Sequence, residues 1–270
     1  MVSKLLKYDF QSYLRLLLPV QVIVIGVALV SRLIQIFEPA NDTQSALNTV
    51  YSGFFTSSIV LYCIAIAVCF VMTVVVSVVR FYQGMYTNEG YLNHTLPVTP
   101  TQHIVAKLLN SMIFYLGTFL AVFVSFIIIT IGELNIELFK AGIYLLNKFI
   151  GEYGTQGVFM IIEAIILVIM FGVHAFLKLY CCISVGQLAK KRKVLLAFGV
   201  YFGLYIVKQI ISTVFIIVAV INMDLMNEIM DWLYDRPSVF LLLMIMYLIV
   251  VSAIYFVVNN LIMSKKLNLT

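Results

Sequence analysis

Long apolar runs separated by short polar segments are the main pattern along this chain. Six of these runs carry few charged residues and are each about 20 residues long or longer, the length that an α-helix needs to cross roughly 30 Å of hydrocarbon. The pattern predicts an all-α membrane protein with a single transmembrane domain over residues 1–270. The six predicted spans cover residues 16–37, 54–79, 108–131, 158–186, 194–221 and 238–261.

Three further segments have a helical period but are too polar to cross a bilayer. Ahead of the first span, apolar residues recur at steps of three and four, so we predict an amphipathic N-terminal helix at the lipid interface. Its apolar residues are Leu6, Phe10, Tyr13, Leu14 and Leu17. Similar stripes at residues 137–150 and 224–235 predict one helix in each of the connections after the third and fifth spans. Each of these helices either rests on the outer interface or covers an exit path.

The polar connection between the second and third spans contains two helix signals. The sequence TPTQ at residues 99–102 has the form of a capping box, so we predict a helix that starts at Pro100 and continues into the third span. Pro97 ends whatever precedes it, which leaves room for about two helical turns between Thr87 and Leu96. The exposed apolar side chains of such a short helix need a cover, which is either the bilayer or a soluble partner.

Composition agrees with a membrane protein. Hydrophobic residues make up 63% of the chain and charged residues 11%, whereas soluble domains are about 45–50% apolar and about 25% charged. The segments between the spans are too short to hold a soluble domain. The apolar excess therefore belongs to the membrane and not to a large soluble core.

Basic residues predict the orientation of the spans. With six spans both termini lie on one side, and that side holds eleven lysine and arginine residues against four on the other. The eleven are Lys4, Lys7, Arg15, Arg80, Lys107, Lys190, Lys191, Arg192, Lys193, Lys265 and Lys266, and the four are Arg32, Lys140, Lys148 and Arg236. Because cytoplasmic loops are enriched in these residues, we predict that both termini and residues 80–107 are cytoplasmic. The net charge of +5 then reports topology and gives no reason to expect nucleic acid as a partner.

Residues 89–107 resemble the first cytoplasmic loop of ABC-2 type permeases, the membrane subunits of one class of ATP-binding-cassette exporter. The shared pattern is Glu-Gly-x-Leu followed by a Leu, a Pro, a Thr and a downstream Lys. In this chain these residues are Glu89, Gly90, Leu92, Leu96, Pro100, Thr101 and Lys107. Six spans, the amphipathic N-terminal helix and the helical loop before the last span also resemble the family. Two features depart from it: Tyr91 stands where many members carry Thr, and the second external loop is long.

The resemblance implies that residues 87–96 form a coupling helix that docks in a groove of an ATPase subunit. The implied coupling residues are Glu89, Gly90, Tyr91, Leu92, Thr95 and Leu96. Because six spans are half of the family's usual twelve, it also implies two ATPase subunits and a second, identical or similar permease. The implied activity is export of a hydrophobic, lipid-like, peptide or drug-like substrate across a bacterial inner membrane. ATP and Mg²⁺ would bind to the partner ATPase, with no cofactor in this chain.

Motifs for nucleotide binding or catalysis are absent from the sequence. The chain has no Gly-x-x-x-x-Gly-Lys-Ser/Thr phosphate loop, no His-Glu-x-x-His and no Gly-x-Ser-x-Gly. Its three histidines share no face that the sequence identifies. We therefore expect that this chain is not itself an enzyme and that it holds no metal ion.

Two ionisable residues inside the predicted spans leave other functions open, because such residues are costly in a membrane and are often functional. Glu163 lies in the fourth span and Lys208 in the fifth, at depths that differ by about 10 Å. They pair, line a polar path, or act as the charge relay of an ATP-independent secondary transporter. A non-transporting membrane anchor is another alternative. Gly199 and Gly203, four residues apart in the fifth span, have the spacing that allows close helix packing.

Overall fold

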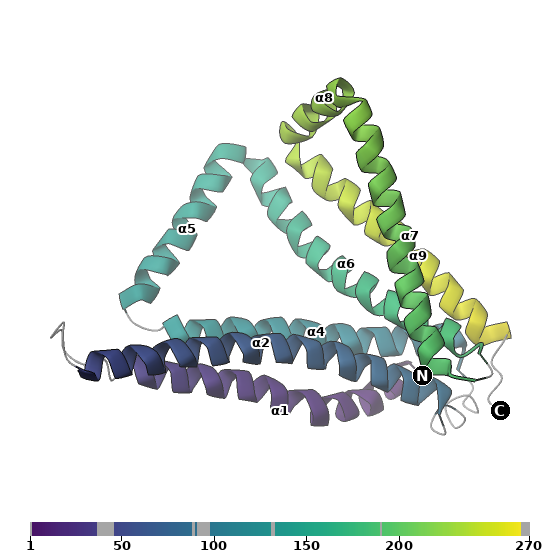
Figure 1. The fold of residues 1–270 in the computed structure, drawn as a ribbon, viewed down its shortest axis with the longest axis horizontal. Helices are drawn as coiled ribbons and strands as arrows, with labels where there is room; N and C mark the ends of the chain where they lie inside the picture. Colours follow the sequence, from purple (N-terminus) through teal and green to yellow (C-terminus); the bar gives the residue numbers. More distant parts are fainter. Residues whose placement is uncertain are drawn as a thin grey trace. The chain divides into compact units, whose positions relative to one another are not determined.

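The structure, a computed structural model, describes residues 2–36, 46–87, 90, 98–130, 133–189 and 191–265 (Figure 1). All regular secondary structure in these ranges is helical. The helices are α1 (Val2–Ile36), α2 (Ala46–Tyr86), α4 (Pro100–Thr130), α5 (Glu133–Tyr153), α6 (Thr155–Gly186), α7 (Lys193–Ile221), α8 (Met223–Tyr234) and α9 (Pro237–Lys265). Six of them, α1, α2, α4, α6, α7 and α9, are long and apolar enough to cross a membrane. The described residues thus confirm a helical protein with six helices able to span a bilayer.

Several helices extend beyond the apolar runs that predicted them. α2 has 41 residues, whereas its apolar run predicted a span over residues 54–79. The helix continues past the last apolar position because backbone hydrogen bonding does not require apolar side chains, and most polar residues cost little in a helix. Helices α5 and α8 confirm the two helices that the stripes at residues 137–150 and 224–235 predicted.

α1 differs from the prediction of a separate interfacial helix at the N-terminus. It runs without a break from Val2 to Ile36 and passes through Pro19, so the amphipathic stripe is the first part of a helix of spanning length. The reason lies on its apolar face, where Tyr13 and Leu17 are buried in a cluster with Val76 of α2 and Phe114 of α4. Tyr13 and Leu17 are thus covered by protein neighbours, whereas Leu14 of the same stripe is exposed, and a position at the lipid interface stays a prediction.

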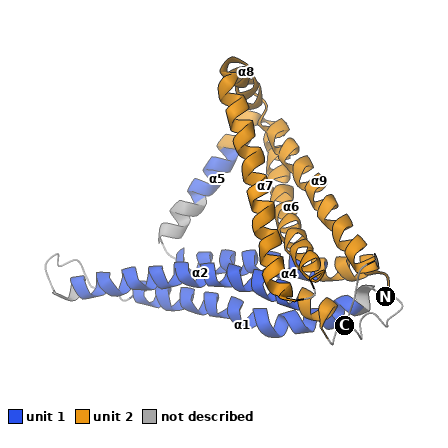
Figure 2. Cartoon of the chain, turned by 45° about the vertical axis from the view of Figure 1, so that its right-hand side comes forward, with its two compact units in different colours: residues 1–80, 109–147 blue, residues 81–108, 148–270 orange. Residues whose placement is uncertain are grey.

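The chain divides into two compact units, coloured separately in Figure 2. Unit 1 consists of Met1–Arg80 and Leu109–Asn147, and unit 2 consists of Phe81–Leu108 and Lys148–Thr270. Helices α2 and α4 therefore contribute to both units. Their ends next to residues 87–99 belong to unit 2, together with α6, α7, α8 and α9.

In unit 1, hydrogen bonds join α1, α2 and α4 at several levels. The hydroxyl oxygens of Thr73 in α2 and Thr118 in α4 are 2.8 Å apart, and Gln21 of α1 donates to Thr118 at 3.3 Å. At another level, the hydroxyl oxygens of Tyr62 and Ser125 are 2.8 Å apart. Polar pairs of this kind hold membrane helices in one register, because apolar side chains alone distinguish neighbouring positions poorly.

In unit 2, α6 packs against α9 and α7, and α8 contacts both α7 and α9. The approach of α6 to α7 at their connection is close. A Cβ atom added to Gly186 would lie 2.7 Å from the Cβ atom of Ala197 and 2.9 Å from the carbonyl oxygen of Lys193. The absence of a side chain at Gly186 is therefore what allows the two helices to meet here.

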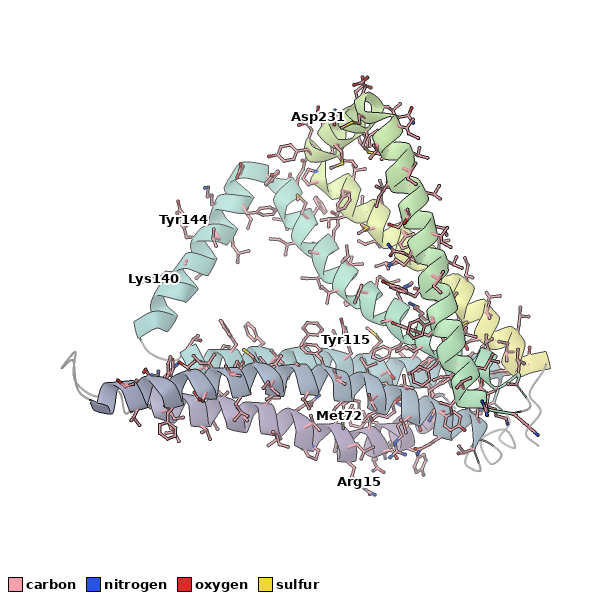
Figure 3. The ribbon with its side chains drawn as sticks, viewed as in Figure 1. Arg15, Met72, Tyr115, Lys140, Tyr144 and Asp231 are labelled. Atoms are coloured by element: carbon pink, nitrogen blue, oxygen red, sulfur yellow. The ribbon has the colours of Figure 1, made fainter. Side chains whose placement is uncertain are left out.

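The apolar faces of α5 and α8 are not covered by the described part of the chain. On α5, Tyr144 extends away from the helix (Figure 3), and Leu146 is exposed as well. On α8, the apolar side chains of Leu225, Ile229 and Trp232 are exposed, and Asp231 on the polar side extends outward (Figure 3). Both interpretations of these helices, a position at the outer interface or a cover over an exit path, therefore stay predictions.

Candidate functional site

Five of the six predicted coupling residues lie outside the described residues. These five are Glu89, Tyr91, Leu92, Thr95 and Leu96. Gly90 is described, and so are the end of α2 and the start of α4 on either side of it. All these described parts belong to unit 2, and the candidate site is built from them.

Gly90 occupies a position where no other residue fits without a shift. Its N–H donates to the carbonyl oxygen of Thr87 at 2.8 Å, just after the end of α2. A Cβ atom at position 90 would lie 2.5 Å from both the carbonyl carbon and the carbonyl oxygen of Met85. The backbone thus folds back onto α2, which gives the glycine of the Glu-Gly-x-Leu pattern a steric reason.

The start of α4 confirms the predicted helix boundary at Pro100. The side-chain oxygen of Gln102 accepts from the backbone N–H of Thr99 at 3.3 Å, which is the reciprocal half of a capping box. The Thr99 hydroxyl lies 2.8 Å from the hydroxyl of Thr101. Lys107, the last residue of the family-like pattern, is buried in α4 and has an interaction partner. The helix that follows the predicted coupling segment therefore begins at a well-defined residue.

A polar network, buried at Ser184 and Asn259 and half-buried at Tyr86, connects the end of α2 to α6 and α9. The hydroxyl of Tyr86, the last residue of α2, donates to Ser184 Oγ of α6 at 2.8 Å. The next partner of Ser184 is the side-chain amide of Asn259 in α9. With its nitrogen toward Ser184, this amide also donates to the Tyr180 carbonyl at 3.1 Å and accepts from the Cys181 N–H at 3.2 Å. We assign this orientation because it satisfies both ends of the amide.

A pair of stacked rings forms a second contact between the same helices. Phe81 of α2 and Tyr180 of α6 have ring centroids 3.9 Å apart and planes at 9°. Both side chains are fully buried, as are Ser184 and Asn259. Sequence reasoning missed this set of residues. The available signal was the presence of polar Ser184 and Asn259 inside predicted spans, but partners 75 and 98 positions apart leave no local pattern.

Glu163 and Lys208, the predicted polar path, have separate surroundings. Both carboxylate oxygens of Glu163 accept from the Ser238 hydroxyl, at 2.7 and 2.9 Å. Ser238 lies in the first turn of α9, where the helix dipole favours a carboxylate. Lys208 is exposed on α7, and no ion pair joins these two described residues. The geometry therefore provides a local reason for Glu163 that does not involve Lys208.

Gly199 and Gly203 lie on a helix with no buried residue, α7. A Cβ atom added to either glycine would meet nothing within 4 Å. Within the described part of the chain, no other helix uses the close approach that this spacing allows. The predicted packing role therefore requires a partner outside this chain.

Neither the described residues nor the comparisons with known proteins assign a metal ion or a protein family to this chain. Among the described residues, no group of three or more His, Cys, Asp and Glu residues could hold a metal ion. No protein-family model matches the chain, and no curated protein or solved structure matches it either.

Proposed function

We propose that this chain is the membrane-spanning permease subunit of an ABC exporter, and that a separate ATPase subunit supplies the energy. The observation that carries the proposal is the connection between α2 and α4. The connection bears the family-like pattern, its glycine is folded back onto α2, and it leads directly into a capped helix of spanning length. In this proposal residues 87–96 are cytoplasmic and dock on the ATPase.

Continuous helices support a mechanical role for this connection. α2 is helical from Ala46 to Tyr86, and α4 is helical from Pro100 to Thr130. A push on residues 87–96 is then applied to two long rods and not to a flexible linker, which would absorb it. ATP binding would close the ATPase pair, displace the connection and rearrange the spans so that a path opens outward.

The proposed assembly contains two permeases and two ATPase subunits in a bacterial inner membrane. The second permease is an identical or similar chain. Support for a contact between the permeases comes from α7, which has no buried residue and carries the uncovered Gly199 and Gly203. The substrate is a hydrophobic, lipid-like, peptide or drug-like molecule held by apolar side chains between the permeases.

The test is purification of the tagged chain from its native membrane. We expect a phosphate-loop ATPase to co-purify in equal numbers with the permease, and we expect ATP hydrolysis to move a fluorescent phospholipid or a hydrophobic dye in reconstituted vesicles. Alanine at Tyr91, Leu92 and Leu96 should abolish co-purification while leaving the chain folded. Absence of an ATPase in the native preparation would overturn the proposal.

The alternatives have less support from the described residues. A secondary transporter based on Glu163 and Lys208 requires communication between them, yet Glu163 bonds Ser238 and Lys208 is exposed on α7. It predicts flux that depends on a proton or sodium gradient and survives ATP depletion. A membrane anchor without transport predicts an ATPase partner whose hydrolysis moves no probe.

A further inference from the structure

Tyr86 is the last residue of α2, and the connection that carries the predicted coupling residues follows directly after it. Its hydroxyl bonds Ser184 of α6, and Ser184 in turn contacts Asn259 of α9. One chain of hydrogen bonds therefore joins three helices whose sequence positions are 98 and 75 residues apart. All three residues belong to unit 2.

We propose that Tyr86, Ser184 and Asn259 form a transmission link, which carries the displacement of residues 87–96 into α6 and α9. The proposal rests on the proposed function, since it assigns the route that the ATPase's motion takes through this chain. The three are positioning residues and bind no ligand. What they determine is whether the motion of the connection reaches helices beyond α2 and α4.

Two features make this contact suited to transmitting displacement. The Ser184–Asn259 bond is buried and the Tyr86–Ser184 bond is partly buried. Pulling Tyr86 from Ser184 leaves the buried Ser184 hydroxyl with one partner fewer, which is more costly than sliding two apolar surfaces. The stacked rings of Phe81 and Tyr180 provide a second contact five residues earlier in α2. Two contacts on one helix resist rotation as well as translation, so the end of α2 and the end of α6 move together.

The end of α2 at Tyr86 is linked through Ser184 to two helices, α6 and α9. α6 packs against α9, and Asn259 bonds the α6 backbone at Tyr180 and Cys181 in addition to Ser184. Asn259 is fully buried. A displacement that reaches Ser184 is therefore shared between α6 and α9.

Unit 1 provides a matched control for the link. Tyr62 of α2 and Ser125 of α4 form the same tyrosine–serine pair with the same 2.8 Å separation, in a more deeply buried environment. Tyr62 lies 24 residues before Tyr86 on α2, about 36 Å along a helix. Tyr62→Phe therefore removes an equivalent hydrogen bond at a position that the link does not include.

Native cysteines supply a reporter that needs no known substrate. Cys181 and Cys182 are free, buried residues of α6 within one turn of Ser184. Cys69, also free and buried, lies in unit 1 and serves as the internal reference. The experiment labels the permease–ATPase complex in lipid nanodiscs with N-ethylmaleimide, with and without ATP and Mg²⁺, and measures each cysteine by peptide mass spectrometry.

We expect ATP to change the labelling rate of Cys181 and Cys182 in the native complex. Tyr86→Phe should reduce this change about fivefold, the effect of losing one hydrogen bond, while the ATPase stays bound. Ser184→Ala should do the same from the α6 side, and Tyr62→Phe should leave the change intact. The link is overturned if ATP does not change the labelling rate of Cys181 and Cys182 in the native complex. It is also overturned if Tyr86→Phe and Ser184→Ala keep the native change in labelling rate, or if Tyr62→Phe loses that change to the same extent. Failure of the proposed function is a different result, namely a native chain without an ATPase.

Discussion

The backbone of Gly90 lies against the carbonyl group of Met85, with room for a hydrogen atom but not for a side chain. A Cβ atom at position 90 would be 2.5 Å from the carbonyl carbon and oxygen of Met85, whereas carbon atoms in contact prefer about 3.5–4.0 Å. Met85 is fully buried in the last turn of α2. The clash is with backbone atoms, so no change of rotamer relieves it, and the path of the chain into the predicted coupling segment depends on this glycine.

The first prediction concerns Gly90→Ala. The added methyl group forces the backbone at position 90 away from Met85, and we expect this to displace the proposed docking residues that follow. We expect recovery of the ATPase with the purified permease to fall at least about fivefold, since overpacking of this kind costs about 1–3 kcal/mol. Gly53→Ala in α2 is the control, because a Cβ atom added there meets nothing within 4 Å. Full recovery with Gly90→Ala would contradict a role for this turn in docking.

The second prediction concerns the close approach of α6 and α7. In Gly186→Ala the new methyl group meets the Cβ atom of Ala197 at 2.7 Å and the Lys193 carbonyl oxygen at 2.9 Å. We expect a loss of about 1–3 kcal/mol in unfolding free energy, seen as a lower Tm of the chain in detergent. Gly26→Ala in α1, where nothing lies within 4 Å, should keep the native Tm. Equal melting of the two variants would show that α6 and α7 do not meet as described.

Apolar length and local signals were sufficient to predict most of the fold. Spanning helices follow from run length, and Pro100 as the start of α4 follows from the sequence TPTQ, because both depend on residues that are neighbours in the chain. The end of α2 at Tyr86 was not predicted, because the length of the apolar run over residues 54–79 does not indicate where the helix itself ends. The continuity of α1 was missed for another reason: an apolar stripe containing Tyr13 and Leu17 suits a lipid surface and a protein neighbour equally well.

The candidate site was predictable only in part. Gly90 was named from a short pattern, but the reason for it, the Met85 backbone, required coordinates. The bonds among Tyr86, Ser184 and Asn259 join residues far apart in the chain. A single sequence shows that such polar residues lie in or beside spans, yet it contains no information on which of them meet.

The third prediction concerns permease association. Gly203→Leu places a large side chain at a position of α7 where an added Cβ atom meets no described neighbour within 4 Å, so we expect the fold of the chain itself to tolerate it. A close helix contact with a second permease should not, because such contacts need small residues. We expect the purified variant to be monomeric by counting subunits in nanodiscs, while Gly26→Leu keeps the native number. Two permeases per particle in Gly203→Leu would place the permease contact elsewhere.

The fourth prediction separates ATP-driven export from a charge relay. Glu163→Gln keeps an acceptor oxygen for Ser238 and removes the charge, so it weakens one charge-assisted hydrogen bond without breaking the contact. If Glu163 only bonds the first turn of α9, ATP-driven movement of a fluorescent phospholipid or dye should stay within about twofold of native. Ser238→Ala, which removes the same bond from the other side, is the matched variant and should behave alike. A charge relay depends on the charge of Glu163 and not on the Ser238 hydroxyl, so it predicts different behaviour of the two variants. Flux would then persist without ATP, vanish in Glu163→Gln and survive in Ser238→Ala.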